Sequence, residues 1–133
     1  MKKVVSLGNV YVMQSRIADA GRGVFARRNI KKDEIIEKCP VIEIPKHDMA
    51  NLRESVLVTY FFFHGKDKEQ VLLALGDGSI YNHANKPNAI YKIKDKDMTI
   101  DFIALRDIKK DDEITFDYYG SSKNKDPLWF VTK

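Results

Sequence analysis

Short apolar segments separated by polar turns run along most of this chain, and their pattern predicts strands rather than long helices. Residues 4–13 are rich in Val, Leu and Tyr and are interrupted at Gly8 and Asn9, which is typical of one or two short strands. Residues 35–45 alternate loosely between apolar and polar side chains and end at Pro45, which cannot donate a ladder hydrogen bond. The first third of the chain therefore predicts a sheet.

The remaining pattern continues this organisation. The apolar residues 56–64 and 71–75 flank the polar turn 65–68, which favours a β-hairpin. Further strands are predicted at 89–93, 99–105 and 113–120, with charged turns at 94–97 and 107–112, and residues 46–53 suit a short helix or turn. We therefore expect a mainly β fold in a single domain covering residues 1–133, with a core at about 4–120 and a tail at 121–133.

The amino-acid composition indicates which classes of protein this chain can belong to. The 133 residues suit one domain, and 44% hydrophobic with 32% charged residues is an ordinary globular balance. A net charge of +4 is low for a dedicated nucleic-acid protein, so direct nucleic-acid binding is not expected. The single cysteine, Cys39, excludes an internal disulfide or a Cys-rich zinc site and suits the core. No segment has the length of a membrane span, so we expect an intracellular protein, in the cytoplasm or the nucleus, and the host nucleus if the source is viral.

Residues 80–88 form an unusually polar connection between apolar segments. They contain Asn82, His83 and Pro87, and the proline disfavours helix just before it, so we expect a rigid, non-regular loop. Alone, this stretch fits either a plain turn with an exposed histidine or a functional site. His83 has no Cys or carboxylate neighbours at metal-ligand spacing, so hydrogen bonding is favoured over metal binding.

Two other segments carry candidate chemistry. Gly21-Arg22-Gly23 precedes an apolar run, which fits a tight turn or a close approach of a ligand to the backbone. The mixed charges at 31–34 and 109–113 are read as solvated turns. The last predicted strand carries Phe116 and Tyr118 in an alternating pattern, which by itself is ordinary strand composition.

Together, the segments 21–26, 81–88 and 112–120, in this order and spacing, closely resemble the SET domain of protein-lysine methyltransferases. The resemblance covers about residues 4–120 and is similar to minimal viral and bacterial SET proteins. It implies small curved β-sheets with a knot-like C-terminal threading (a pseudoknot) and few short helices. It also implies that S-adenosylmethionine is the methyl donor, leaving as S-adenosylhomocysteine, and that no metal is used.

The resemblance carries roles to individual residues. Gly21, Arg22, Gly23, Asn82 and His83 would hold the cofactor, largely through backbone groups, together with Tyr118 and, from the tail, Trp129. Tyr118 matches the catalytic tyrosine, Phe116 the position associated with the number of methyl groups added, and Tyr60 a residue lining the lysine channel. A phenol of ordinary pKa near ~10 is an orienting hydroxyl rather than a base at neutral pH.

Phe116 has no hydroxyl to restrain the amine, so di- or trimethylation is predicted. The implied partner is a protein with an accessible lysine, for which a histone or other basic tail is one candidate. The tail lacks the cysteines that bind zinc in many relatives, so Trp129 and Phe130 would complete the site or a homodimer interface. The alternative is a SET-like module that binds a peptide or the cofactor without turnover.

Overall fold

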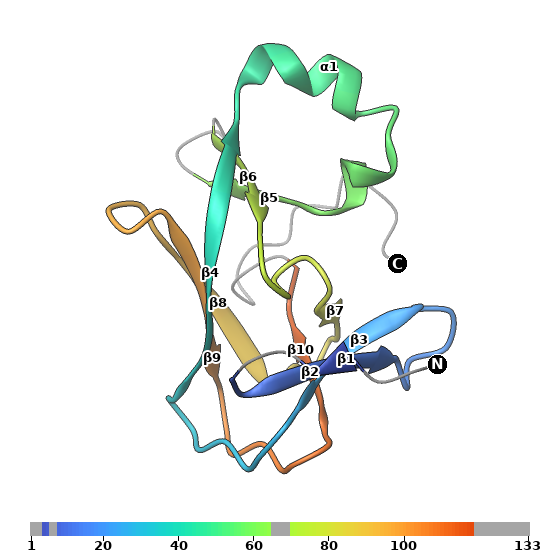
Figure 1. The fold of residues 1–133 in the computed structure, drawn as a ribbon, viewed down its shortest axis with the longest axis vertical. Coiled ribbons are helices and arrows are strands. Elements are labelled where there is room, and N and C mark those ends of the chain that lie inside the picture. Colours follow the sequence, from blue (N-terminus) through green and yellow to red (C-terminus); the bar gives the residue numbers. More distant parts are fainter. Residues whose placement is uncertain (1–3, 6–7, 65–69, 119–133) are drawn as a thin grey trace.

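The computed structural model describes residues 4–5, 8–64 and 70–118, and their strands form two five-stranded sheets (Figure 1). The first sheet contains, in spatial order, β1 (Val4–Val5), β2 (Val10–Gln14), β3 (Arg22–Ala26), β10 (Glu113–Phe116) and β7 (Asn82–His83). The second contains β5 (Phe61–His64), β6 (Gln70–Ala74), β4 (Ile35–Ile44), β9 (Thr99–Ala104) and β8 (Ala89–Lys94). The predicted mainly β fold is confirmed.

The helical residues lie between β4 and β5. They form η1 (Lys46–Asp48), α1 (Met49–Leu52) and η2 (Val56–Thr59), so the expected short helix or turn is confirmed. The prediction of one strand over residues 56–64 was wrong for its first half. Ser55 Oγ accepts a hydrogen bond from Leu57 N at 3.2 Å and caps a 3-10 turn there, a choice that an apolar run does not reveal.

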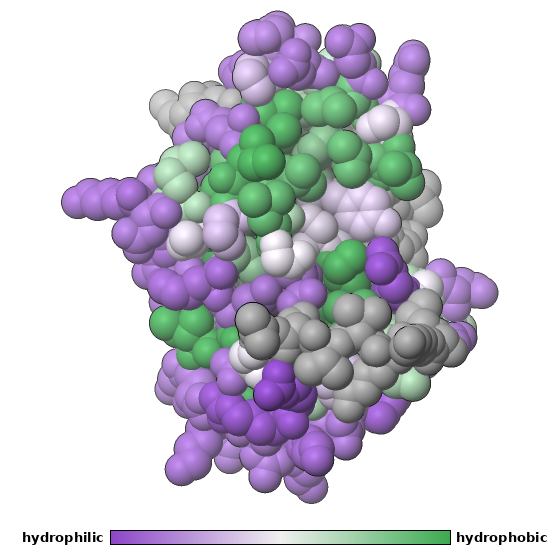
Figure 2. Space-filling model, viewed as in Figure 1, coloured by the Kyte–Doolittle hydropathy of each residue, from purple (hydrophilic) through white to green (hydrophobic). Residues whose placement is uncertain are grey.

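The core consists of a large and a small cluster. The large one packs residues from both sheets and includes fully buried side chains such as Val24, Phe102 and Ile114, each of which contributes about 1.5–3 kcal/mol on burial. Cys39 is 0% exposed, as predicted. The small cluster joins Met49 to β5 and β6. Figure 2 shows apolar surface on the upper part of one face, where Figure 1 places β5, β6 and the helical segment.

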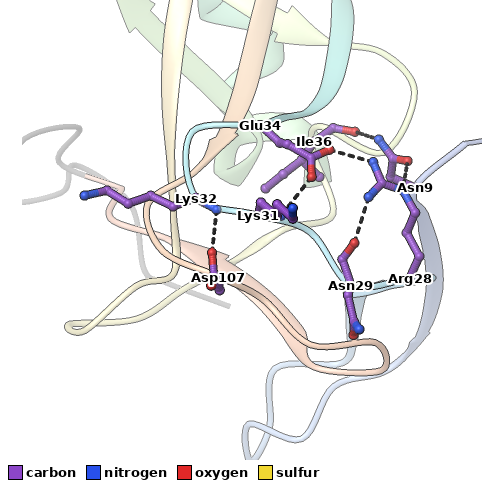
Figure 3. A network of polar contacts seen from close by, with 8 residues as sticks. All are labelled: Asn9, Arg28, Asn29, Lys31, Lys32, Glu34, Ile36 and Asp107. Atoms are coloured by element: carbon purple, nitrogen blue, oxygen red, sulfur yellow. Dashed lines mark hydrogen bonds and ion pairs between the residues drawn. The ribbon is translucent and has the colours of Figure 1, made fainter.

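Hydrogen bonds join two charged turns, one between β3 and β4 and the other between β9 and β10. Ile30 and Ile108 exchange two backbone hydrogen bonds of 2.8 and 2.7 Å. Beside them, Lys32 N donates to Asp107 Oδ1 at 2.8 Å (Figure 3). The contact is reciprocal, because Lys110 N of the second turn donates to an asparagine oxygen of the first at 2.9 Å. Most charged side chains of these turns are exposed, as predicted, but the prediction was wrong for Glu113, which is half-buried in β10. The turns also place the start of β10 beside β3.

Arg28 ties the same region to the first hairpin. Its guanidinium donates to Asn9 Oδ1 at 2.9 Å, to Asn29 O at 2.7 Å and to Glu34 Oε2 at 2.7 Å, and Asn9 Nδ2 donates to Ile36 O at 3.0 Å (Figure 3). Because these bonds join β2 to the entry of β4, the two sheets are held at a defined relative position.

The last strand brings distant segments together. β10 pairs antiparallel with β3 and parallel with β7, with Thr115 opposite Asn82 and Phe116 opposite His83. The predicted non-regular loop therefore contains a two-residue strand, because β10 supplies hydrogen-bonding partners that local sequence does not show. β10 ends at Phe116, earlier than predicted. No helix in the described part of the chain is long and apolar enough to span a bilayer.

Candidate functional site

Asn82 joins the segments that the motifs single out. Asn82 is 2% exposed, and its Nδ2 donates to Arg22 O at 2.9 Å and to Glu113 Oε2 at 3.1 Å. These bonds connect β7 to β3 and to the start of β10. The structure therefore brings the three motifs into one site, as the resemblance implied.

Glu113 is the residue of this site that sequence reasoning missed. Its carboxylate accepts from Ser15 Oγ at 2.8 Å, Arg16 N at 2.9 Å and Asn82 Nδ2 at 3.1 Å. A Cβ on Gly23 would overlap this carboxylate, so the second glycine of the motif is required for close packing. The only sequence signal for Glu113 was its place at the boundary between a charged turn and a strand, where a charge is ordinary.

A cavity of about 750 Å³ lies beside this junction. It is lined by the loop from Gln14 to Arg22 together with Tyr60 and Ile80. This volume is within the range of small-molecule sites. Gly21 adopts φ +73°, a left-handed conformation that favours glycine, so the first glycine shapes the loop that lines the cavity. Among the predicted cofactor residues, Gly21 and Arg22 line the cavity directly.

One buried acceptor at the junction has no partner. Asn82 Oδ1 is a buried side-chain oxygen for which the described residues provide no hydrogen bond. Leaving such an atom unsatisfied typically costs about 1–3 kcal/mol, so this oxygen is suited to a hydrogen-bond donor beyond the described residues. Asn82 does not line the cavity, but its Nδ2 holds the carbonyl of Arg22, which does.

Phe116 and Tyr118 lie in a cluster of aromatic rings. Phe116 is 3% exposed, stacks on Phe62 at a centroid distance of 5.8 Å, and meets the edge of Tyr91 at 5.4 Å and 86°. The Tyr118 ring lies 5.0 Å from Phe116. Burial, followed by the charge of nearby Tyr60, raises the pKa of Tyr118 to about 12. Its hydroxyl is therefore protonated at neutral pH.

Tyr91 is a second residue that sequence reasoning missed. Burial, followed by the charge of Asp117, raises its pKa above the ordinary value. Its place in a predicted strand gave no reason to select it, because an aromatic residue there is typical of a sheet core. Its edge-on contact with Phe116 makes it part of the same aromatic cluster.

His83 holds the backbone that carries Tyr118. Its Nδ1 accepts from Tyr118 N at 3.0 Å, and its Nε2 lies 3.3 Å from Asn85 Oδ1. This pattern fits the neutral tautomer with a proton on Nε2. The Asp117 carboxylate is 3.8 Å from Nδ1. His83 thus acts through hydrogen bonds, as predicted, and supports Tyr118 rather than lining the cavity.

The predicted site residues that the structure describes therefore fall into three neighbouring groups. Gly21, Arg22 and Tyr60 line the cavity, while Gly23 and Asn82 meet at the junction below it. The remaining described residues, Phe116, Tyr118 and His83, form the aromatic side. Trp129 lies outside the described residues, so its part in the site stays a prediction. The part of the chain that the structure describes contains no group of three or more His, Cys, Asp or Glu side chains suited to a metal ion.

Comparisons with known proteins agree on one family. The profile of the SET domain matches residues 21–119. The chain is 34% identical over 111 residues to the histone-lysine N-methyltransferase, H3 lysine-37 specific, of Schizosaccharomyces pombe, which covers 83% of this chain and 70% of that protein.

Solved structures show the same fold. A crystal structure of a candidate histone methyltransferase from Plasmodium falciparum has a TM-score of 0.70 and 34% identity, covering 88% of this chain and 98% of that one. A Chaetomium thermophilum polycomb repressive complex 2, described as autoinhibited and bound to S-adenosylmethionine, has a TM-score of 0.71 at 22% identity. That match covers 90% of this chain and 16% of that one, and at this identity it shows the fold alone.

Proposed function

Because the chain belongs to the SET-domain family and is a protein-lysine methyltransferase, we propose that it uses S-adenosylmethionine to di- or trimethylate a lysine on a protein substrate. The single observation that carries this proposal is the junction at Asn82, which joins a cavity of about 750 Å³ to the aromatic cluster around Tyr118.

The cavity and its loop fit the methyl donor. Gly21 and Arg22 line the cavity, and Asn82 fixes the second of them by donating to its carbonyl. When bound, S-adenosylmethionine supplies a methyl carbon whose bond to sulfur breaks as the lysine nitrogen bonds to it, leaving S-adenosylhomocysteine. Glu113 holds the loop by accepting from Ser15 and Arg16, so the shape of the cavity is set before the donor binds.

The aromatic cluster fits the lysine. Lysine has an ordinary pKa of ~10.4, and an apolar surrounding lowers it by disfavouring the charged ammonium. Phe116, Tyr118, Tyr60 and Tyr91 provide such a surrounding, and the ammonium proton must leave before the nitrogen lone pair can react. Because the pKa of Tyr118 is raised to about 12, its phenol remains protonated and orients the amine rather than removing its proton.

The proposed degree of methylation depends on Phe116. A phenylalanine at this buried position offers no hydroxyl to hold a water or to restrain an amine that already carries a methyl group. Space without a competing hydrogen bond favours further rounds of transfer, which supports di- or trimethyl products over monomethyl lysine alone.

Histones are the first substrates to test. The fission yeast relative is named as a histone H3 enzyme, and the basic tails of histones present accessible lysines. A homodimer completed by the tail that contains Trp129 stays a prediction.

The test is a methylation assay with labelled S-adenosylmethionine and recombinant histones, read by mass spectrometry. Tyr118→Phe should lower kcat by at least about 100-fold, the scale observed when an active-site hydrogen-bond donor is removed. Tyr11→Phe is the control, because Tyr11 is a tyrosine in the core, 5% exposed, whose hydroxyl donates elsewhere, to Asp111 at 2.7 Å, whereas Tyr118 is half-buried. Tyr11→Phe should retain normal kcat.

Two outcomes would count against the proposal. Full labelling by Tyr118→Phe would remove Tyr118 from its role. Tight binding of the donor with no methylation of histones or of proteins in a cell lysate would instead favour a binding module without turnover.

A further inference from the structure

A half-buried carboxylate outside the site accepts hydrogen bonds from the segment that leads to Asn82. Glu37 lies on β4, and its Oε1 accepts from the hydroxyl of Tyr81 at 2.7 Å. Its Oε2 accepts from Asp77 N at 3.0 Å. A Cβ on Gly76 would lie only 2.7 Å from Oε2, so the turn before Tyr81 packs closely on this carboxylate. Both oxygens are therefore engaged by the segment that leads into β7.

Tyr81 links this carboxylate to the aromatic side of the site. It is 1% exposed, and its ring stacks on Phe102 with a centroid distance of 4.2 Å and an interplanar angle of 20°. Its backbone carbonyl accepts from the hydroxyl of Tyr118 at 3.3 Å. That distance is long for a hydroxyl hydrogen bond, so a shift of a few tenths of an ångström in Tyr81 would break it.

The hydrogen-bonded pair of Glu37 and Tyr81 places a carboxyl group beside the apolar core. Burial raises the pKa of Glu37, and burial followed by the charge of Glu37 raises the pKa of both Tyr81 and Cys39. The titratable groups that face Glu37 are Tyr81, Cys39 and Asp77. Burying a carboxyl beside an apolar core is costly, and an apolar pair of similar size would fill the same space without that cost.

We propose that Glu37 is a positioning residue for methyl transfer: it fixes Tyr81, whose carbonyl in turn holds the hydroxyl of Tyr118. The inference rests on the proposed function for its kinetic consequence, but the positioning of Tyr118 is a structural claim that can be measured without turnover. Glu37 does not contact the substrate or the donor in this role.

The variants separate positioning from simple loss of stability. Glu37→Ala and Tyr81→Phe each remove the hydrogen bond and should lower kcat about tenfold or more, with the Kd for S-adenosylmethionine within about twofold of wild type. The double variant should be no slower than the worse single variant, because both changes remove the same link. Glu37→Gln, unlike Glu37→Ala, should keep kcat near the wild-type value, since the glutamine amide can accept from Asp77 N and donate to the Tyr81 hydroxyl.

Asp101→Asn is the matched control. Asp101 is a carboxylate on the neighbouring strand β9 that is more deeply buried than Glu37, at 1% exposed, and it accepts from Lys38 Nζ at 2.8 Å and Thr99 Oγ1 at 3.0 Å. It has no bond to Tyr81. This variant should lower stability and leave kcat unchanged at a temperature well below its unfolding transition.

The second readout is fluorine NMR of protein labelled with 3-fluorotyrosine, with the Tyr118 signal assigned by its loss in Tyr118→Phe. The signal should shift in Glu37→Ala and Tyr81→Phe and remain in place in Glu37→Gln and Asp101→Asn. An unmoved signal in folded Glu37→Ala and Tyr81→Phe would overturn the inference, as would equal shifts in Asp101→Asn. If the variants show the expected shifts but the wild-type protein methylates no substrate, the proposed function is refuted and the positioning role remains supported.

Discussion

Replacing Gly23 with alanine should disturb the carboxylate that joins the motifs of the site. Gly23 lies within β3 and does not have a positive φ, so the effect of the new methyl group is steric rather than conformational. The added Cβ would overlap Glu113 Oε2 and would lie 3.0 Å from Glu113 Cδ and 3.1 Å from Asn82 Nδ2. The Glu113 side chain can move, but its hydrogen bonds would then be lost.

The magnitude follows from those bonds. Glu113 accepts from Ser15 Oγ, Arg16 N and Asn82 Nδ2 at 2.8, 2.9 and 3.1 Å. Hydrogen bonds to a charged group contribute about 1.5–3 kcal/mol each, so breaking two of them without replacement would cost about 3–6 kcal/mol. Water replaces part of this loss at a half-buried site. We therefore expect Gly23→Ala to lower the free energy of unfolding by about 2–4 kcal/mol.

The assay is urea unfolding followed by circular dichroism, together with calorimetric titration with S-adenosylmethionine, whose affinity should fall because the cavity loop is released. The control is the double variant Gly23→Ala/Glu113→Ala, in which the overlapping carboxylate is absent. Its destabilisation should be smaller than the sum of the single effects by at least about 1 kcal/mol. A single Gly23→Ala variant within about 0.5 kcal/mol of wild type, with unchanged donor affinity, would refute the reasoning.

Three further predictions concern Phe116, Tyr118 and the core residue Cys39. Phe116→Tyr places a hydroxyl among the aromatic rings and should shift the products toward monomethyl lysine, as read by mass spectrometry; unchanged trimethyl product would contradict the role of Phe116. The folded-state pKa of Tyr118 is raised to about 12 while the unfolded value is ~10, so this residue stabilises the fold fully below about pH 10, and that stabilisation is lost as the pH rises from about 10 to 12. Urea unfolding across this range should show a shallower decline for Tyr118→Phe, and an identical decline would exclude this contribution. Cys39 is 0% exposed, and its pKa is raised by burial and then by the charge of Glu37. A thiol reagent should therefore label it only when the protein is unfolded. Rapid labelling of the native protein would contradict this prediction.

Local pattern was sufficient for much of the sheet. The strand at Ile35–Ile44 ends where Pro45 predicted, and the strands β8 and β9 lie where two apolar segments flank a charged turn. The pattern failed at Val56–Thr59, because a short apolar run fits a 3-10 turn as well as a strand. The pattern also predicted too long a strand at β10, because the alternation of apolar and polar residues continues beyond Phe116, where the strand ends.

The sequence by itself determined the mainly β class, the turns, and the three motifs whose residue types identify the family. These features are local, since strand periodicity and turn chemistry depend on residues close together in the chain. Only the tertiary structure decided that Asn82 would bind both Arg22 and Glu113, and that Glu37 would reach Tyr81. Such contacts join residues many positions apart, and they form only when the packing of the two sheets compensates for the entropy of closing the loops between them.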